Sequence, residues 1–165
     1  MKTAIVYYSM LGNTKYVADK IAEQLGATDE VDIIRIEPAK AYPDKGFKKF
    51  FWGGKSATMA EKPELVPYDF DAEKYDRIIW GTPVWAGTFT PPLRTFIAEN
   101  PAVKSKQSAV FMCSGGGSDK KAKKKLAECL GIEAFVADVL LFDPKDNVKD
   151  EDAGKIEAFC KALME

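Results

Sequence analysis

The fold is decided by Thr3-Ala4-Ile5-Val6-Tyr7-Tyr8 and the following Ser9-Met10-Leu11-Gly12-Asn13-Thr14. The first run is apolar without polar alternation, which is typical of a central parallel strand buried on both faces. After the loop, apolar residues recur at every fourth position from Val17 to Leu25, and Gly26 stands where a helix C-cap is expected. The sequence therefore predicts a strand, a short loop and a helix.

The loop at residues 9–14 has the composition of an anion site. Its small and hydroxyl residues precede the helix, where unpaired backbone N–H groups and the positive helix end can hold a phosphate. Gly12 would let the backbone approach such a ligand closely. A simpler alternative is an ordinary turn in which Ser9, Asn13 or Thr14 caps the helix.

Strand and helix patterns alternate to the end of the chain. Further strands are predicted at residues 31–36, 77–80, 108–112 and 136–142. Apolar stripes predict helices around residues 93–97, 122–130 and 156–163. This alternation indicates an α/β fold, a doubly wound parallel sheet with helices on both faces. At 165 residues, the chain is expected to form a single domain over residues 1–165.

Ligands of such sheets bind beyond the carboxyl ends of the strands. The loop after the third predicted strand, residues 81–92, has Trp85 flanked by glycines, and the loop after the fourth has three consecutive glycines at 115–117. Consecutive glycines suggest close approach of the backbone to a ligand, although a flexible turn with Ser118 or Asp119 as N-cap is an alternative. Because these loops share one sheet edge with the loop at residues 9–14, we predict a single site there.

Composition narrows the function classes. The chain has 24 basic and 25 acidic residues and a pI of about 5.7, a balance that argues against a nucleic-acid partner. Apolar runs are too short for a membrane span or a secretory signal, so a cytoplasmic location is expected. The sequence has no histidine, and Cys113, Cys129 and Cys160 lack metal-ligand spacing. Neither a metal site nor a catalytic side chain is predicted.

The loop at residues 9–14 resembles the phosphate loop of the flavodoxin family, and the resemblance extends over essentially the whole chain. The family pattern is Thr/Ser-x-Thr/Ser-Gly-Asn-Thr, which Ser9, Gly12, Asn13 and Thr14 match, whereas Leu11 replaces a hydroxyl residue. The resemblance implies a five-stranded sheet of order 2-1-3-4-5. It also implies FMN as cofactor, with its isoalloxazine ring between the loops after the third and fourth strands.

The other two loops match the family less completely. Trp85 corresponds to the aromatic residue that stacks on the flavin in many flavodoxins. The next residue, often a glycine whose peptide rotates when the flavin takes one electron, is Ala86 here, with Gly87 following. Since alanine resists positive φ, we expect weaker stabilisation of the one-electron-reduced flavin. The third loop has no aromatic residue, so one flavin face is expected to be open to a substrate or nicotinamide, or covered by Phe50, Phe51 or Trp52.

Together, the resemblance and the loop positions imply the FMN-binding residues. The first loop would bind the phosphate, the second would hold the ring edge, and the third would offer N–H groups to the pyrimidine oxygens. The predicted residues are Ser9, Met10, Leu11, Gly12, Asn13, Thr14, Thr82, Pro83, Val84, Trp85, Ala86, Gly87, Ser114, Gly115, Gly116 and Gly117.

Two other segments stand out. The long connection at residues 38–75 has Phe47, Phe50, Phe51 and Trp52 at partly helical spacing before Gly53-Gly54. These aromatics would most simply pack on the sheet; the alternative is a lid or a partner-binding patch. The lysines between residues 120 and 125 would form a solvated helix face, or a weak anion patch for NADPH phosphates or an acidic partner.

The predicted function is electron transfer by a flavodoxin-like FMN protein, with a redox protein or a small molecule as partner. An alternative is an FMN-dependent NAD(P)H oxidoreductase of the quinone type, because the chain is less acidic than typical electron-carrying flavodoxins. A third hypothesis is a non-redox regulatory module such as a phosphoacceptor receiver. That module would need an acidic cluster after the first strand, which Tyr7-Tyr8-Ser9 does not supply.

Overall fold

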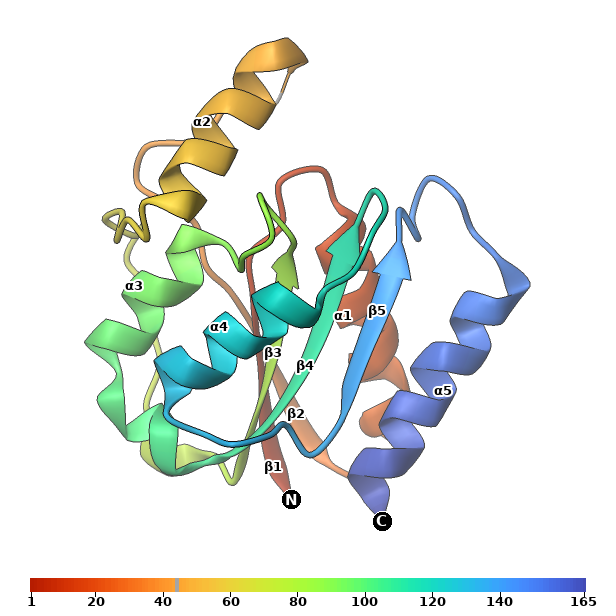
Figure 1. Cartoon of the computed structure of the whole chain (residues 1–165). Helices are drawn as coiled ribbons and strands as arrows, with labels where there is room; N and C mark the ends of the chain where they lie inside the picture. Colours follow the sequence, from red (N-terminus) through yellow and green to blue (C-terminus); the bar gives the residue numbers. More distant parts are fainter. Residues whose placement is uncertain (44) are drawn as a thin grey trace.

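A computed structural model describes residues 1–43 and 45–165, and the side chains of all of these except residues 46–51. A five-stranded parallel sheet lies at the centre, in the order β2-β1-β3-β4-β5 (Figure 1). The strands are β1 (Lys2–Tyr7), β2 (Glu30–Arg35), β3 (Arg77–Pro83), β4 (Gln107–Ser114) and β5 (Asp138–Phe142). The predicted fold class and strand order are confirmed.

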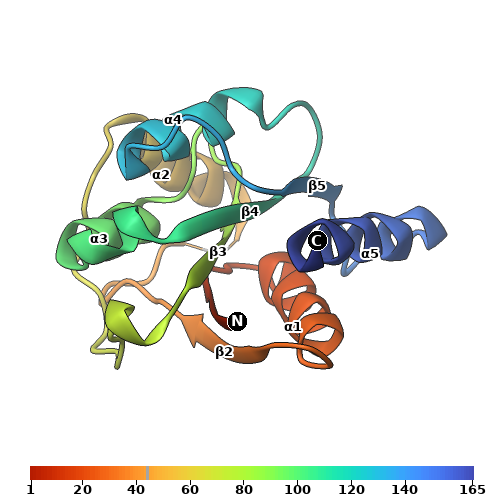
Figure 2. The same ribbon diagram turned by 90° about the horizontal axis from the view of Figure 1, so that it is seen from below.

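Helices cover both faces of the sheet. Figure 2 shows α1 (Asn13–Leu25) and α5 (Asp150–Met164) on one side, and α3 (Pro91–Glu99) and α4 (Lys120–Leu130) on the other. Two short 3₁₀ helices, η1 (Ala72–Lys74) and η2 (Pro101–Ser105), lie in the connections before β3 and β4. The four predicted helices are therefore confirmed. The glycine after α4, Gly131, adopts the left-handed conformation of a helix cap, whereas Gly26 ends α1 with a right-handed φ of −62°.

The apolar run of β1 builds two cores because successive side chains point to opposite faces of a strand. Ile5 and Tyr7 pack with α1 and α5, where Ile21 and Phe159 are buried. Ala4, Val6 and Tyr8 pack with the apolar stripes of α3 and α4. The side chains of residues 3–8 are all buried, as predicted for a central strand.

The long connection contains a further helix, α2 (Gly46–Thr58), which lies beyond the carboxyl ends of the strands and away from the sheet (Figure 1). It continues through Gly53-Gly54, although each glycine disfavours a helix by about 1 kcal/mol relative to alanine. The Trp52 side chain is 47% exposed, so for this residue the prediction of packing on the sheet is wrong. The side chains of Phe47, Phe50 and Phe51 lie outside the described set.

A buried ion pair closes the amino end of the sheet. The Arg77 side chain, at the start of β3, is fully buried, and its guanidinium donates to the Asp29 carboxylate. It also donates to Thr3 Oγ1 at 3.2 Å and to the Leu163 carbonyl at 2.6 Å. These contacts tie β1, β3 and the end of α5 together, opposite the edge at which the ligand loops converge. Across the described ranges, no helix combines the length and the apolar character that crossing a bilayer requires.

Candidate cofactor site

A cavity of about 510 Å³ opens at the carboxyl edge of the sheet, where the loops after β1, β3 and β4 meet. This volume lies within the range of about 300 to 1,000 Å³ that is usual for small-molecule and cofactor sites. The cavity is lined by Ser9, Met10, Leu11, Asn13, Thr14, Gly54, Pro83, Val84, Trp85, Ala86, Cys113, Ser114, Gly115 and Asp143. The three loops predicted to form one site all line this one cavity.

Most of the predicted residues line this cavity, and five do not. Those on its wall are Ser9, Met10, Leu11, Asn13, Thr14, Pro83, Val84, Trp85, Ala86, Ser114 and Gly115. Gly12, Thr82, Gly87, Gly116 and Gly117 are not among the lining residues. Gly12, Thr82 and Gly87 instead shape or support the loops.

The loop after β1 turns at Gly12, which has φ +98° and occupies the N-cap of α1. Its N–H donates to Ser9 Oγ at 3.1 Å, which closes the loop. No side chain caps the first turn at this N-cap, so the alternative with Ser9, Asn13 or Thr14 as the capping residue is wrong. The first N–H groups of a helix have no intrahelical partner. An uncapped helix end on the cavity side favours an anion there.

Trp85 and Thr88 close the second loop through paired backbone hydrogen bonds of 2.9 and 3.0 Å. The two residues between them, Ala86 and Gly87, have φ +49° and +69°, which is the pattern of a type I′ turn. Ala86 thus already adopts the positive φ that we expected an alanine to resist, because this tight turn imposes it. Gly87 completes the turn and does not line the cavity.

Thr82 supports the second loop from within the protein. Its side chain is fully buried and lies 2.9 Å, oxygen to oxygen, from Thr90 Oγ1, and it accepts the Thr90 N–H at 3.1 Å. These bonds join the end of β3 to the start of α3. Thr82 therefore positions the loop rather than facing the cavity.

The third loop forms a turn of its own. Ser114 Oγ donates to the Gly116 carbonyl at 2.6 Å and accepts the Gly116 N–H at 3.1 Å. A Cβ atom at Gly116 or Gly117 would meet no atom within 4 Å, so close packing within the protein does not explain these glycines. At the start of α4, Ser118 Oγ accepts the Lys120 N–H at 3.2 Å, while Asp119 occupies the N-cap without a side-chain cap.

Trp85 lies in an aromatic cluster against which α2 packs. Its ring centroid is 5.7 Å from that of Tyr8 and 5.2 Å from that of Tyr42, both in edge-on geometry. Gly53 of α2 lies against the same indole, and Gly54 adjoins Ala86 and lines the cavity. The absence of a side chain at Gly53 therefore eases close packing of the helix on the second loop. Consecutive glycines within a helical pattern are a signal of such packing.

Sequence reasoning also missed Cys113 and Asp143. Cys113 is the next-to-last residue of β4; its side chain is buried, and burial raises the pKa of its thiol to about 12, while a hydrogen bond with Thr14 acts in the opposite direction. Asp143 follows β5 and has φ +41°. The loop after β5 lies at the same sheet edge as the three predicted loops, and this topology could have identified it.

Asn13 joins that fourth loop to the first. Its side-chain carbonyl accepts the backbone N–H of Lys145 at 2.9 Å, and its amide nitrogen lies 3.5 Å from Asp143 Oδ1. Asn13 is therefore a link between the two loops as well as part of the cavity wall. Within the described ranges, no group of three or more cysteine and acidic side chains is placed to hold a metal ion.

Comparisons with known proteins agree with this geometry. The flavodoxin family model matches residues 2–150. A flavoprotein from Lactobacillus acidophilus NCFM, solved in complex with FMN, is 24% identical, with a TM-score of 0.69, and the match covers 88% of this chain and 95% of that one.

More distant structures share the fold. A flavodoxin from the domain Archaea is 17% identical with a TM-score of 0.58, and the match covers 97% of this chain and 94% of the other. The azoreductase AzrA is 15% identical with a TM-score of 0.55, and the match covers both chains fully. At these identities the structural likeness concerns the fold. The family model, which spans nearly the whole chain, shows that this protein belongs to the flavodoxin family.

Proposed function

We propose that this protein is an electron-transfer flavodoxin that carries FMN in the cavity at the carboxyl edge of its sheet. FMN is the cofactor of the flavodoxin family to which the chain belongs. The observation that carries the proposal is the convergence of the loops after β1, β3 and β4 on one cavity that has Trp85 in its wall.

The chemistry of the wall fits such a cofactor. The loop with Ser9 and the uncapped start of α1 offers hydrogen-bond donors to a phosphate. Met10, Val84 and Trp85 give apolar surface for an aromatic ring system. Gly54 and Gly115 carry no side chain, so the backbone can lie close to a flat ligand there.

The chain's own residues would bind, orient and shield the cofactor, which supplies the redox chemistry when bound. Among the described lining residues, Cys113 and Asp143 are the titratable ones. The raised pKa of Cys113 keeps its thiol neutral near pH 7. A cavity wall with so few ionisable groups is consistent with electron transfer, which requires no acid or base from the protein.

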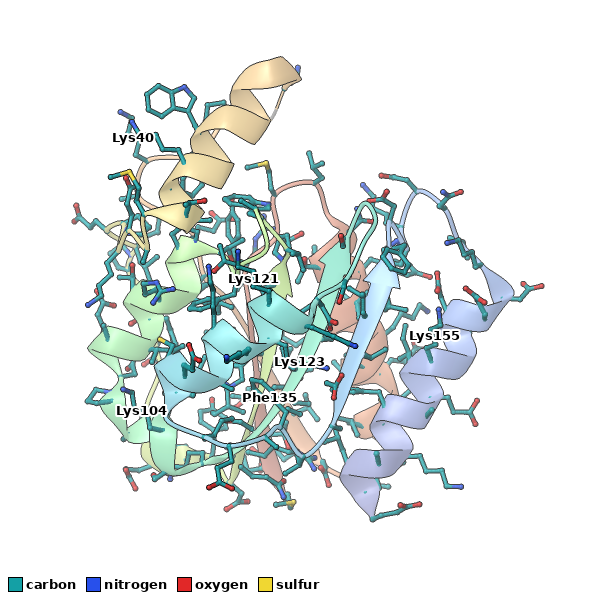
Figure 3. All side chains as sticks on the ribbon, viewed as in Figure 1. Lys40, Lys104, Lys121, Lys123, Phe135 and Lys155 are labelled. Atoms are coloured by element: carbon teal, nitrogen blue, oxygen red, sulfur yellow. The ribbon has the colours of Figure 1, made fainter. Side chains whose placement is uncertain are left out.

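An FMN-dependent NAD(P)H oxidoreductase of the quinone type is the second candidate. The similarity of the fold to an azoreductase favours it, as does the third loop, which lines the cavity with the small residues Ser114 and Gly115 and with no aromatic ring. Lys121 of α4 adds a cation near the second loop: its Cδ is 3.3 Å from the position of a Cβ at Gly87 (Figure 3). A cation in that place could attract the phosphates of a dinucleotide.

Anaerobic reduction separates the two candidates. The purified protein would be saturated with FMN, and the flavin absorbance followed after addition of dithionite and, separately, of NADPH or NADH. We expect complete reduction by dithionite and reduction by nicotinamides that is no faster than that of free FMN. Rapid, saturable reduction by either nicotinamide would instead support the oxidoreductase. Failure to bind FMN would contradict both candidate functions and would favour the non-redox regulatory module.

A further inference from the structure

The loop after β5 places a lysine on the phosphate loop. Lys145 Nζ donates to the carbonyl oxygen of Leu11 at 3.3 Å. Leu11 lies in the segment predicted to hold the phosphate, and it lines the cavity. A side chain from a segment 134 residues away therefore contributes a positive charge at this loop.

This contact is held by several features. The Lys145 backbone N–H is fixed by Asn13 Oδ1 at 2.9 Å, which sets where the side chain starts. The side chain then runs past Gly12, where a Cβ atom would lie only 3.1 Å from Nζ and 3.2 Å from Cδ. The missing side chain at Gly12 thus leaves the path along which Lys145 reaches Leu11.

The ammonium group has capacity for another ligand. Within the described residues no carboxylate lies within 4.0 Å of Lys145 Nζ, so no ion pair occupies its charge; Lys104 and Lys121 share this property, and what sets Lys145 apart is its contact with the Leu11 carbonyl. An ammonium has three donors, and the Leu11 carbonyl uses one of them. A phosphate beside the loop would receive one or both of the others as charge-assisted hydrogen bonds.

We propose that Lys145 is the counter-charge of the flavin phosphate and makes the site selective for FMN over riboflavin, which lacks the phosphate. This inference rests on the proposed function, because it assumes that FMN binds at this cavity. The Asp143 carboxylate, on the same loop, repels an anion in the cavity. A cation that offsets this repulsion therefore contributes more to phosphate binding. Since Lys145 is exposed, its effect should be moderate and sensitive to salt.

The test compares the dissociation constants of FMN and riboflavin for the cofactor-free protein and for Lys145→Gln, by quenching of flavin fluorescence. Lys104→Gln is the matched control: it makes the same charge change in η2, at the opposite end of the molecule (Figure 3). We expect Lys145→Gln to weaken FMN binding roughly three- to tenfold at low salt and to leave riboflavin binding unchanged. Lys104→Gln should change neither, and Lys145→Arg should retain most of the FMN affinity.

Two further measurements distinguish a charge effect from a structural one. The slope of log Kd for FMN against log salt should be smaller in Lys145→Gln, and the loss of affinity should shrink below about pH 6, where a phosphate monoester loses its second charge. An equal loss for FMN and riboflavin, or no loss for either, would overturn the role of Lys145 alone. If the unaltered protein binds neither flavin, the proposed function fails, and the role of Lys145 fails with it.

Discussion

Gly53 lies against the indole of Trp85: a Cβ atom at Gly53 would be only 3.2 Å from Cε3 and 3.3 Å from Cζ3 of that ring. A side chain at this position would crowd the indole, so the glycine favours close packing of α2 on the second cavity loop. The neighbouring Gly54 has more room, since a Cβ there would lie 3.7 Å from that of Ala86. This contact makes α2 part of the cofactor site although it lies beyond the sheet.

A large side chain at Gly53 should therefore disturb the site. We expect Gly53→Leu to displace Trp85 or α2 and to weaken FMN binding by about tenfold or more, a size that corresponds to the usual cost of overpacking. Titration with FMN measures the loss. The control is Gly154→Leu in α5, where a Cβ meets no atom within 4 Å. Equal FMN affinity in the two variants would show that the α2 contact does not shape the site.

The strained turn at Ala86 predicts a stabilising substitution. A φ of +49° costs an alanine about 1 to 2 kcal/mol, and glycine avoids this cost while losing more chain entropy on folding. We expect Ala86→Gly to raise the free energy of unfolding by about 0.5 to 1 kcal/mol in urea titrations. Ala158→Gly, at an exposed position within α5, should lower it by a similar amount. If the free energy of unfolding changed in the same direction in both variants, backbone strain at Ala86 would be contradicted.

Burial predicts the reactivity of the cysteines. The pKa of Cys113 is raised to about 12 and that of Cys160 to about 11, chiefly because burial disfavours the thiolate, which is the reactive form. At pH 8 we expect a thiol reagent to modify Cys129, which is partly exposed, well before Cys113 and Cys160. Peptide mapping after timed labelling identifies the order. Early labelling of Cys113 in the native protein would contradict its buried state.

The raised pKa of Cys113 makes the stability of the protein depend on pH. An unfolded cysteine ionises near pH 9, whereas Cys113 in the folded protein stays protonated to about pH 12. The contribution of Cys113 to the free energy of unfolding is therefore complete below pH 9. It is lost as the pH rises from 9 towards 12, because only the unfolded state releases the proton in that interval. We expect Cys113→Ala to show a shallower decline of unfolding free energy between pH 9 and 11. Parallel declines in the two proteins would argue against the linkage.

The buried end of the sheet should be sensitive to the loss of its carboxylate. Asp29→Ala would leave the fully buried Arg77 guanidinium without its ionic partner, and we expect a loss of about 3 kcal/mol in unfolding free energy. Asp19→Ala removes an exposed partner of Lys15 and should cost less than about 1 kcal/mol. Urea titration of both variants measures the difference. Similar small losses would mean that the guanidinium finds sufficient partners in Thr3 and Leu163.

Local pattern predicted the sheet and its four covering helices because each element carries its own periodicity. The first loop could be identified from Ser9, Gly12, Asn13 and Thr14 because these residues are close together in the sequence and form a local motif. No local motif marks Asp143 or Gly54 as part of the cavity, since strand order brings Asp143 there and the docking of α2 brings Gly54. Tertiary packing likewise overrode two local rules: Gly53-Gly54 lies inside a helix, and Ala86 has positive φ.

The decisive measurement is titration of FMN into the cofactor-free protein and, for comparison, into Trp85→Ala. We expect one FMN per chain, strong quenching of flavin fluorescence by the unaltered protein, and markedly weaker binding and quenching by Trp85→Ala, because Trp85 forms part of the cavity wall. No binding of FMN, or binding and quenching that are the same with and without Trp85, would contradict the proposed FMN site.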